Sequence, residues 1–359
     1  MGANGGGPSA PAPGPWDGRE KSSGWAGSTG WTGWTGWAGW AVAAGLLLLA
    51  PRVLERGTLN DLWNVAFGVI LASSWNILGG LAGQVSIGYS AFIGIGAYTT
   101  VLLSLKGVDP YLTLPLAALL GALFSVVIGL PAFRLRGPYF TIVTIGVSEA
   151  VRVIASGVAF TGGASGLRMP AGTFDFEKNY AAMTMLAVFA TLVVSLLMRS
   201  RFGAALSAIR QDIDAAEALG IDATRHKLLA HALSAALVSL AGGIYAINFQ
   251  YVAPGSVFDF RLSLSIVLMP IIGGVGTVFG PVLGAVIFSY LQIKLLAIPA
   301  LRDSYLFLYG GLLILVMLFE PKGLVGLLSR LRSAVGRFRA PRTGLPAPGP
   351  GVNGGTGGR

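Results

Sequence analysis

The feature that most constrains the fold is a series of long apolar segments, separated by short polar or glycine-containing stretches. A helix of about 20 apolar residues crosses the hydrocarbon core of a bilayer, so such segments predict membrane-spanning helices. Only 11% of the residues are charged, whereas ordinary soluble domains carry about 25%. The period-two alternation typical of a membrane β-barrel is absent from these segments. The sequence therefore predicts an all-α, polytopic membrane protein.

About ten spans are expected, in a membrane domain that covers residues 31–328. A run of Trp every third residue from Trp31 to Trp40 favours a membrane interface over a ligand-stacking platform and leads into a first span that ends near Ala50. Residues 262–296 allow two spans, one long helix or a re-entrant pair, because Gly273-Gly274-Val275-Gly276 interrupts the run. The other nine spans are expected at about 62–80, 86–104, 111–132, 139–158, 181–198, 228–250, 262–275, 279–296 and 304–319.

The ends of the chain differ from this domain in composition. Residues 1–30 are rich in Gly, Pro and Ser and are predicted to be disordered, and residues 329–359 form a basic and then Gly- and Pro-rich tail. With ten spans and a cytoplasmic N-terminus, sixteen basic residues fall on the cytoplasmic side and eight on the outer side. This distribution follows the positive-inside rule, so the net charge of +10 indicates orientation rather than nucleic-acid binding. Both termini are predicted to be cytoplasmic.

A charged segment from Arg199 to Lys227 interrupts the apolar pattern with five basic and four acidic residues. Its Ala-rich part, 204–219, favours one helix, and Gly220 is a suitable C-terminal stop. A short helix held between two spans can receive force from a partner outside the bilayer. The residues expected to form such a coupling loop are Arg210, Asp214, Ala215, Ala216, Glu217 and Gly220.

Polar residues within the apolar segments are candidates for a substrate path. Glu149 and Arg152 are the acid and base placed deepest within a span, and their i, i+3 spacing puts them on one helix face. They either pair with each other or present opposite charges to a zwitterionic substrate, and Arg152 also lies near enough to the span end to snorkel. Gln84 and Ser86 serve either helix packing or a polar substrate, and Thr141 and Thr144 are weaker candidates on the helix of Glu149.

Nothing in the sequence indicates bond chemistry or a cofactor. The chain has no cysteine, no Gly-Lys-Ser/Thr of a phosphate-binding loop, no His-Glu-x-x-His and no Gly-x-Ser-x-Gly. His226 and His231 are five residues apart, which does not place them on one helix face as metal ligands. No catalytic or metal-binding residues are therefore predicted.

Several segments carry patterns with a family likeness. Gly83–Tyr98 has the form GQxSxGxxxFxGxGAY, and residues 136–140 have the form RGxYF. Thr161–Leu167 has the form TGGxxGL, and Gly273–Gly284 has the form GGxGxxxGPxxG. Residues 318–324 have the sequence Leu-Phe-Glu-Pro-Lys-Gly-Leu. In this order, over about residues 60–328, they resemble the M-type permease of branched-chain amino acid ABC transporters. The spacing acid-Ala-Ala-x-x-x-Gly over Asp214–Gly220 also resembles the EAA signature of ABC-importer permeases. The chain departs from the family at Asp214, where Glu is usual, at Glu320, where a base is common, and in its long N-terminal extension.

This resemblance implies a pore subunit of an ATP-driven importer in a bacterial inner membrane, with ABC-importer permease architecture. It implies a related H-type permease as the second half of the pore, two cytoplasmic ATP-binding subunits that dock on the coupling loop, and an external substrate-binding protein. Leucine, isoleucine and valine are the expected substrates, and urea or short amides remain alternatives.

A secondary transporter or channel is the rival interpretation. It predicts inverted repeats and coupling-ion residues at the midplane, and it leaves the charged segment without a role.

Overall fold

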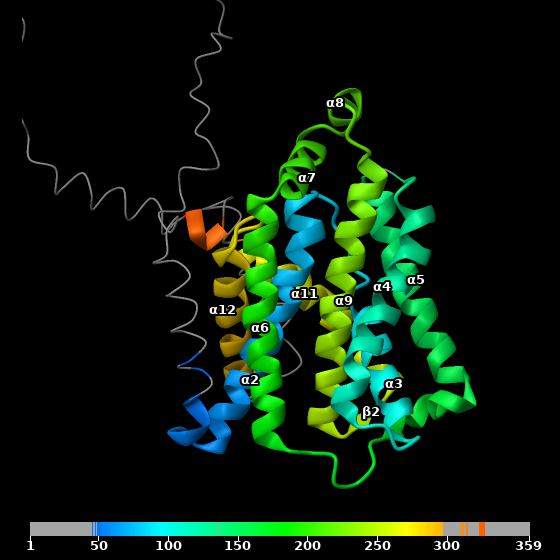
Figure 1. The fold of residues 1–359 in the computed structure, drawn as a ribbon, viewed down its shortest axis with the longest axis vertical. Coiled ribbons are helices and arrows are strands. Elements are labelled where there is room, and N and C mark those ends of the chain that lie inside the picture. Colours follow the sequence, from blue (N-terminus) through cyan, green and yellow to red (C-terminus); the bar gives the residue numbers. More distant parts are fainter. Residues whose placement is uncertain are drawn as a thin grey trace, which may run out of the picture. The chain divides into compact units, whose positions relative to one another are not determined.

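The computed structural model describes residues 45, 47, 49–135, 137–296, 310, 311, 314 and 323–326. Most of this part of the chain is helical (Figure 1). The α-helices are α2 (Arg56–Trp75), α3 (Ser90–Ser104), α4 (Leu114–Ala132), α5 (Pro138–Gly157), α6 (Phe176–Arg199), α7 (Arg201–Gln211), α8 (Ile213–Ala218), α9 (Ala223–Phe249), α10 (Pro254–Val257), α11 (Phe260–Gly273) and α12 (Phe279–Leu296).

Short elements connect or extend these helices. A π-helical segment, η3 (Asn76–Leu81), continues α2, and two-residue strands β1 (Leu167–Arg168) and β2 (Tyr251–Val252) pair antiparallel. The register of this pair places Leu167 opposite Val252. The 3-10 helices are η2 (Ala50–Arg52), η4 (Pro110–Thr113), η5 (Ala159–Thr161) and η6 (Gly163–Ser165).

The predicted all-α membrane fold is confirmed. Within the described residues, six helical stretches are long and apolar enough to cross a membrane, and α3 and α12 are shorter apolar helices. These eight correspond to the second to ninth predicted spans. The predicted first span, the predicted tenth span at 304–319, the predicted disordered residues 1–30 and the tail 329–359 lie wholly or largely outside the described residues.

Small residues let the central helices approach closely. On α4, Ala117, Gly121, Ser125 and Gly129 recur every fourth residue and are buried, and α4 packs this stripe against α9. On α3, a Cβ at Gly96 would collide with the backbone carbonyl of Ser239 in α9. Membrane helices associate through such small-residue faces because close backbone contact maximises van der Waals packing. The glycine at position 96 thus lets α3 and α9 approach closely.

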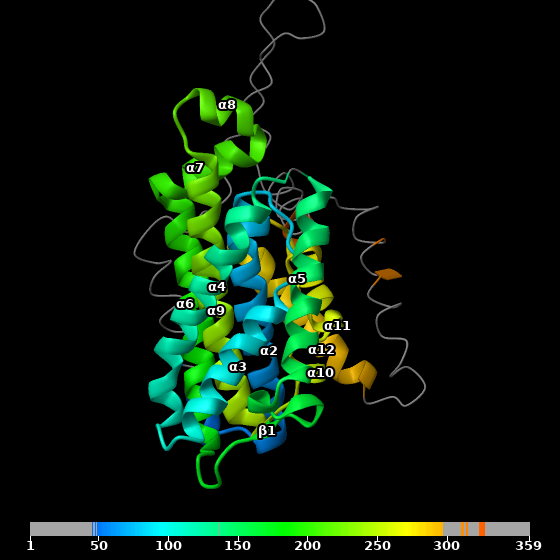
Figure 2. The same cartoon turned by 90° about the vertical axis from the view of Figure 1, so that its right-hand side faces the viewer.

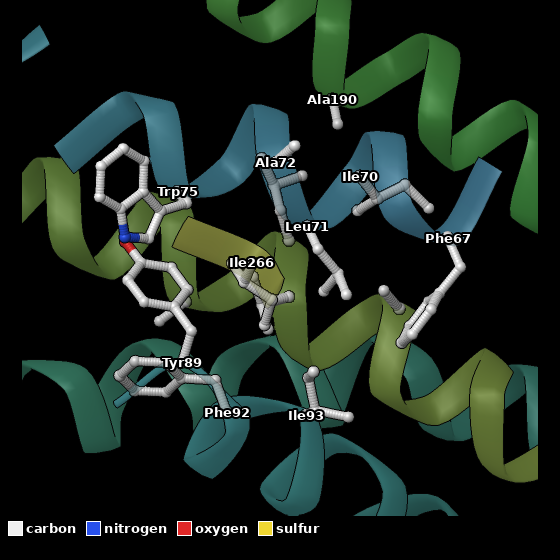
Figure 3. Close-up of a cluster of buried hydrophobic side chains, with 14 of the residues drawn as sticks. Phe67, Ile70, Leu71, Ala72, Trp75, Tyr89, Phe92, Ile93, Ala190 and Ile266 are labelled. Atoms are coloured by element: carbon white, nitrogen blue, oxygen red, sulfur yellow. The ribbon is translucent and has the colours of Figure 1, made fainter. Parts of the chain in front are cut away.

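Helix α2 lies at the centre of the bundle and contacts α6, α9, α11 and α12. It is buried along most of its length, and Ile70, Leu71 and Trp75 are at most 1% exposed. Figure 3 shows side chains of α2 beside Tyr89, Phe92 and Ile93, with Ala190 of α6 and Ile266 of α11 on the same cluster; Tyr89 immediately precedes α3. Any displacement of α2 therefore reaches several helices at once.

Residues 262–296 form two helices rather than one long helix. The chain turns between Gly274 and Val278, and α11 and α12 pack antiparallel, with Gly273 facing Gly280 and Gly284. Asn76, at the start of the π-helical segment, binds this turn: its amide donates to the Thr277 carbonyl (2.9 Å) and its side-chain oxygen accepts from the Gly276 N–H (2.8 Å). The turn is thus attached to the end of α2.

Candidate functional site

The charged segment folds as two helices, α7 and α8, at one end of the bundle (Figures 1 and 2). The prediction of a single helix over 204–219 is wrong, because the backbone of Asp212 is extended (φ −156°, ψ 118°). Its carboxylate instead caps α8 by accepting the N–H of Ala215 (3.0 Å). Aspartate is a strong N-cap residue, and here capping prevails over the helix propensity of the surrounding alanines. Gly220 follows α8 with φ +85°, as expected for a glycine stop.

Most of α8 is open to contact from outside the chain. Asp214, Ala215 and Glu217 are exposed, whereas Ala216 is 2% exposed and packs inward. Leu219, which the sequence interpretation did not select, is 81% exposed at the end of α8. A single exposed apolar residue is common on protein surfaces, so Leu219 alone does not mark an interface. The sequence feature that could have identified this position is an isolated leucine directly before Gly220.

Arg210, in contrast, turns toward the membrane helices. It lies in the last turn of α7, and its Nη1 donates to the carbonyl oxygen of Gly80 (2.6 Å) at the end of the π-helical segment. Of the predicted coupling residues, three face outward on α8, Ala216 packs inward, Gly220 follows the helix, and Arg210 reaches the bundle.

Residues 82–89 are non-helical and lie between the π-helical segment and α3, so the predicted span at 86–104 is helical only from Ser90. Backbone polar groups at membrane depth must be satisfied by protein or water. Trp75 Nε1 donates to the Ser86 carbonyl (2.8 Å) and Thr141 Oγ1 to the Val85 carbonyl (2.8 Å). The Ile87 N–H donates to Thr144 Oγ1 (3.2 Å).

Four of the six predicted path residues thus meet at this segment. Thr141 and Thr144 hold its backbone from α5, Ser86 is buried, and Gln84 is 9% exposed. Beside them is a small, partly open hollow lined by Ser86, Gly88, Phe92, Thr144, Val147 and His231, among others. A buried serine cluster, also missed by the sequence interpretation, joins α3, α5 and α11: Ser90 Oγ hydrogen-bonds Ser148 Oγ and accepts from Ser263 Oγ, both at 2.8 Å.

Glu149 and Arg152 pair with each other on α5, as one of the two predicted arrangements requires. Arg152 Nε donates to Glu149 Oε2 (2.9 Å), and Arg152 Nη2 makes a second contact with Glu149 Oε1. The side chains of Glu149 and Arg152 are 49% and 36% exposed, whereas Thr144 and Ser148 on the same helix are buried. The ion pair is therefore open to a partner rather than packed into the bundle.

The exposed faces of α4 and α5 differ in chemistry. Helix α4 exposes an all-apolar set, Leu116, Leu119, Leu120, Leu123, Val127 and Leu130, which suits contact with lipid. Helix α5 exposes Glu149 and Gly146 among apolar residues such as Ile142 and Val153. Charged side chains within a membrane almost always face a bundle interior or a water-filled cavity. The exposed face of α5 therefore has the composition of a pore-lining or subunit-facing surface.

The described residues hold no group of three or more His, Cys, Asp or Glu that could bind a metal ion. His226 stacks on Phe202, and His231 is buried among the rings of Tyr89, Phe92 and Phe133. The two histidines thus occupy separate surroundings.

The apolar helices, the non-helical segment within the membrane region and the charged face of α5 define a multi-pass membrane transport protein. Residues 58–317 match the family described as the permease component of the branched-chain amino acid transport system. The chain belongs to this family, and it is a multi-pass inner membrane protein of the permease type.

The names of its relatives refer to more than one substrate. The chain is 31% identical to the high-affinity branched-chain amino acid transport system permease protein LivM of Salmonella typhimurium, over 78% of this chain and 73% of the relative. It is 30% identical to LivM of Escherichia coli, with the same coverage. It is also 26% identical to the autoinducer 2 import system permease protein LsrC of Salmonella paratyphi B, over 71% of this chain and 78% of the relative. No solved structure matches the chain.

Proposed function

We propose that this protein is a pore-forming subunit of an ATP-driven importer for branched-chain amino acids. A related H-type permease would form the other half of the pore, and an external binding protein would deliver the substrate. The observation that carries this proposal is the Glu149–Arg152 pair on the exposed face of α5. A zwitterionic amino acid offers an ammonium for Glu149 and a carboxylate for Arg152, and nearby Ile142 and Val153 suit an aliphatic side chain.

ATP hydrolysis is assigned to separate subunits. The chain has no phosphate-binding loop, and α8 offers an exposed surface with Leu219 at its end. In the proposed mechanism two ATPase subunits hold α8, and their closure on ATP displaces α7 and α8 against the bundle. The pore then opens alternately to the two sides, and no bond of the substrate is broken.

Uptake by the reconstituted system tests the function. The permease, its sister subunit, the ATPase and the binding protein are placed in liposomes, and uptake of labelled leucine, isoleucine and valine is measured with and without ATP. We expect uptake that requires ATP and exceeds the uptake of urea or acetamide by at least about tenfold, since the charged pair and an apolar surface together match only the amino acids. Preferred uptake of urea or a short amide would reassign the substrate, and uptake without ATP would indicate a secondary transporter or channel.

A second prediction concerns orientation: both the 199–227 segment and the chain after Lys322 are proposed to face the cytoplasm, as the basic residues indicate. Because the chain has no cysteine, single cysteines at positions 165, 207 and 333 report each side separately. A membrane-impermeant thiol reagent added to intact cells is expected to label Ser165→Cys and to leave Ser207→Cys and Ser333→Cys unlabelled until the cells are opened. Labelling of Ser207→Cys in intact cells would invert the arrangement.

A further inference from the structure

The end of α2 is held from two sides, by α7 and by the turn between α11 and α12. On one side Arg210 donates to the Gly80 carbonyl (2.6 Å). On the other side Asn76, which is fully buried, makes both of its hydrogen bonds to Gly276 and Thr277. These contacts fall within the six residues Asn76–Leu81, the π-helical segment. Segments about 130 and 200 residues away in the sequence therefore meet on little more than one helical turn.

The local backbone explains why an arginine can bind there. Carbonyls at the C-terminal end of a helix lack intrahelical donors, and a basic side chain satisfies them and interacts favourably with the helix dipole. Gly83 lies in the left-handed region (φ +71°), and a Cβ at this position would come within 2.8 Å of Arg210 Cγ. The glycine thus leaves the space through which the arginine stem passes.

The contact between Asn76 and the turn between α11 and α12 is equally close. A Cβ at Gly80 would collide with the side-chain oxygen of Asn76 and lie 2.9 Å from the Gly276 nitrogen. The turn itself is internally braced, because Thr277 Oγ1 donates to the Gly274 carbonyl and accepts from the Gly280 N–H, both at 2.9 Å. A displacement of the π-helical segment is therefore transferred to α11 and α12 through a rigid turn. π-Helical turns within α-helices occur frequently at functional sites.

We infer that Arg210 is a positioning residue that transmits displacement of α7 and α8 through the π-helical segment Asn76–Leu81 to the α11–α12 turn. This inference rests on the proposed function, in which ATPase subunits move α7 and α8. Arg210 is exposed but its guanidinium binds the carbonyl of Gly80 in the π-helical segment, whereas the residues that would meet the ATPase lie on α8. Docking and transmission are thus assigned to different residues, and a substitution at Arg210 separates them.

The test compares Arg210→Gln with Arg201→Gln in the reconstituted importer. Arg201 is an exposed arginine at the start of the same helix, so its substitution makes the same change of charge away from the π-helical segment. We expect Arg210→Gln to retain co-purification of the ATPase and its hydrolysis of ATP, while substrate transported per ATP falls about tenfold, within the range of typical coupling between sites. Arg201→Gln should transport normally. Arg210→Lys keeps a cationic donor for Gly80 and should recover most of the ratio.

The outcomes separate this inference from the proposed function. Transport per ATP is a ratio, so it can be measured even if the yield of Arg210→Gln is low. Equal ratios for Arg210→Gln and Arg201→Gln would overturn the transmission role, and so would loss of the ATPase from Arg210→Gln, which would make Arg210 a docking residue. Absence of ATP-driven uptake by the unmodified protein would contradict the proposed function itself.

Discussion

Replacing Leu219 by aspartate is expected to release the ATPase subunits from the permease while leaving the permease itself intact. The side chain is 81% exposed within the chain, so its removal costs little packing here, but in the proposed complex it would be buried by the partner. A charge in that position should weaken association by about 30-fold or more, the effect of losing an interface hot spot. Co-purification of the ATPase and ATP-driven uptake measure the effect, and thermal unfolding of the purified permease checks its integrity.

The chain offers a matched control for this experiment. Ala215→Asp changes an exposed position on α8 and should behave like Leu219→Asp, whereas Ala204→Asp adds the same charge to an exposed position on α7 and should not. Gly220 is a less clean probe, because any larger residue there also adopts a strained left-handed conformation. Ala216 is likewise unsuitable, since it packs inward. Unchanged co-purification and uptake in both α8 variants would remove α8 from the docking surface.

The double substitution of Glu149 and Arg152 by leucine is expected to give a protein that accumulates normally but transports at least about tenfold more slowly, since two charge-assisted contacts to the substrate are lost. Either single substitution should lower the yield instead, because it leaves one charge in the membrane without its partner. Expression level, thermal stability and uptake are measured for all three variants. Stimulation of the ATPase by loaded binding protein should also disappear in the double variant.

A neighbouring position serves as the control for this series. Ile154→Leu changes an exposed apolar residue of the same helix that is not assigned to the substrate site, and it should preserve both yield and uptake. If the Glu149–Arg152 double variant transports normally, the pair only stabilises α5 and the substrate path lies elsewhere. If both single variants are normal in yield and uptake, neither role holds and Arg152 is an interface residue.

The spans could be predicted because their signal is local. Apolar runs of sufficient length gave the positions of α2, α4, α5, α6 and α9 to within a few residues at most ends, and the i, i+3 spacing gave the pairing of Glu149 with Arg152. The direction in which that pair faces depends on which side of α5 packs against the bundle. Neither the spacing nor the hydropathy contains that information.

The errors occur where tertiary contacts or side-chain caps decide the local structure. Residues 86–89 were included in a predicted span, yet residues 82–89 are non-helical, and Trp75 and two threonines of α5 bind their backbone. A single helix was expected over 204–219 because the alanines favour a helix. In the structure Asp212 interrupts it, because aspartate prefers to cap the N-terminus of a helix. The inward path of Arg210 depends on Gly83, 127 residues earlier in the chain.

The manner in which residues 82–89 are held has an evolutionary consequence. Trp75, Thr141 and Thr144 bind main-chain atoms of residues 85–87, and these atoms are the same whatever side chain stands there. Position and chemical identity are therefore uncoupled at the exposed Val85, whereas Gly83 and Gly88 are fixed by close packing and Ser86 is buried. A mutation of Val85, which is 40% exposed, can change the exposed chemistry of this stretch while the scaffold keeps its geometry. A backbone held in this way allows an exposed side chain to change here without a first loss of stability.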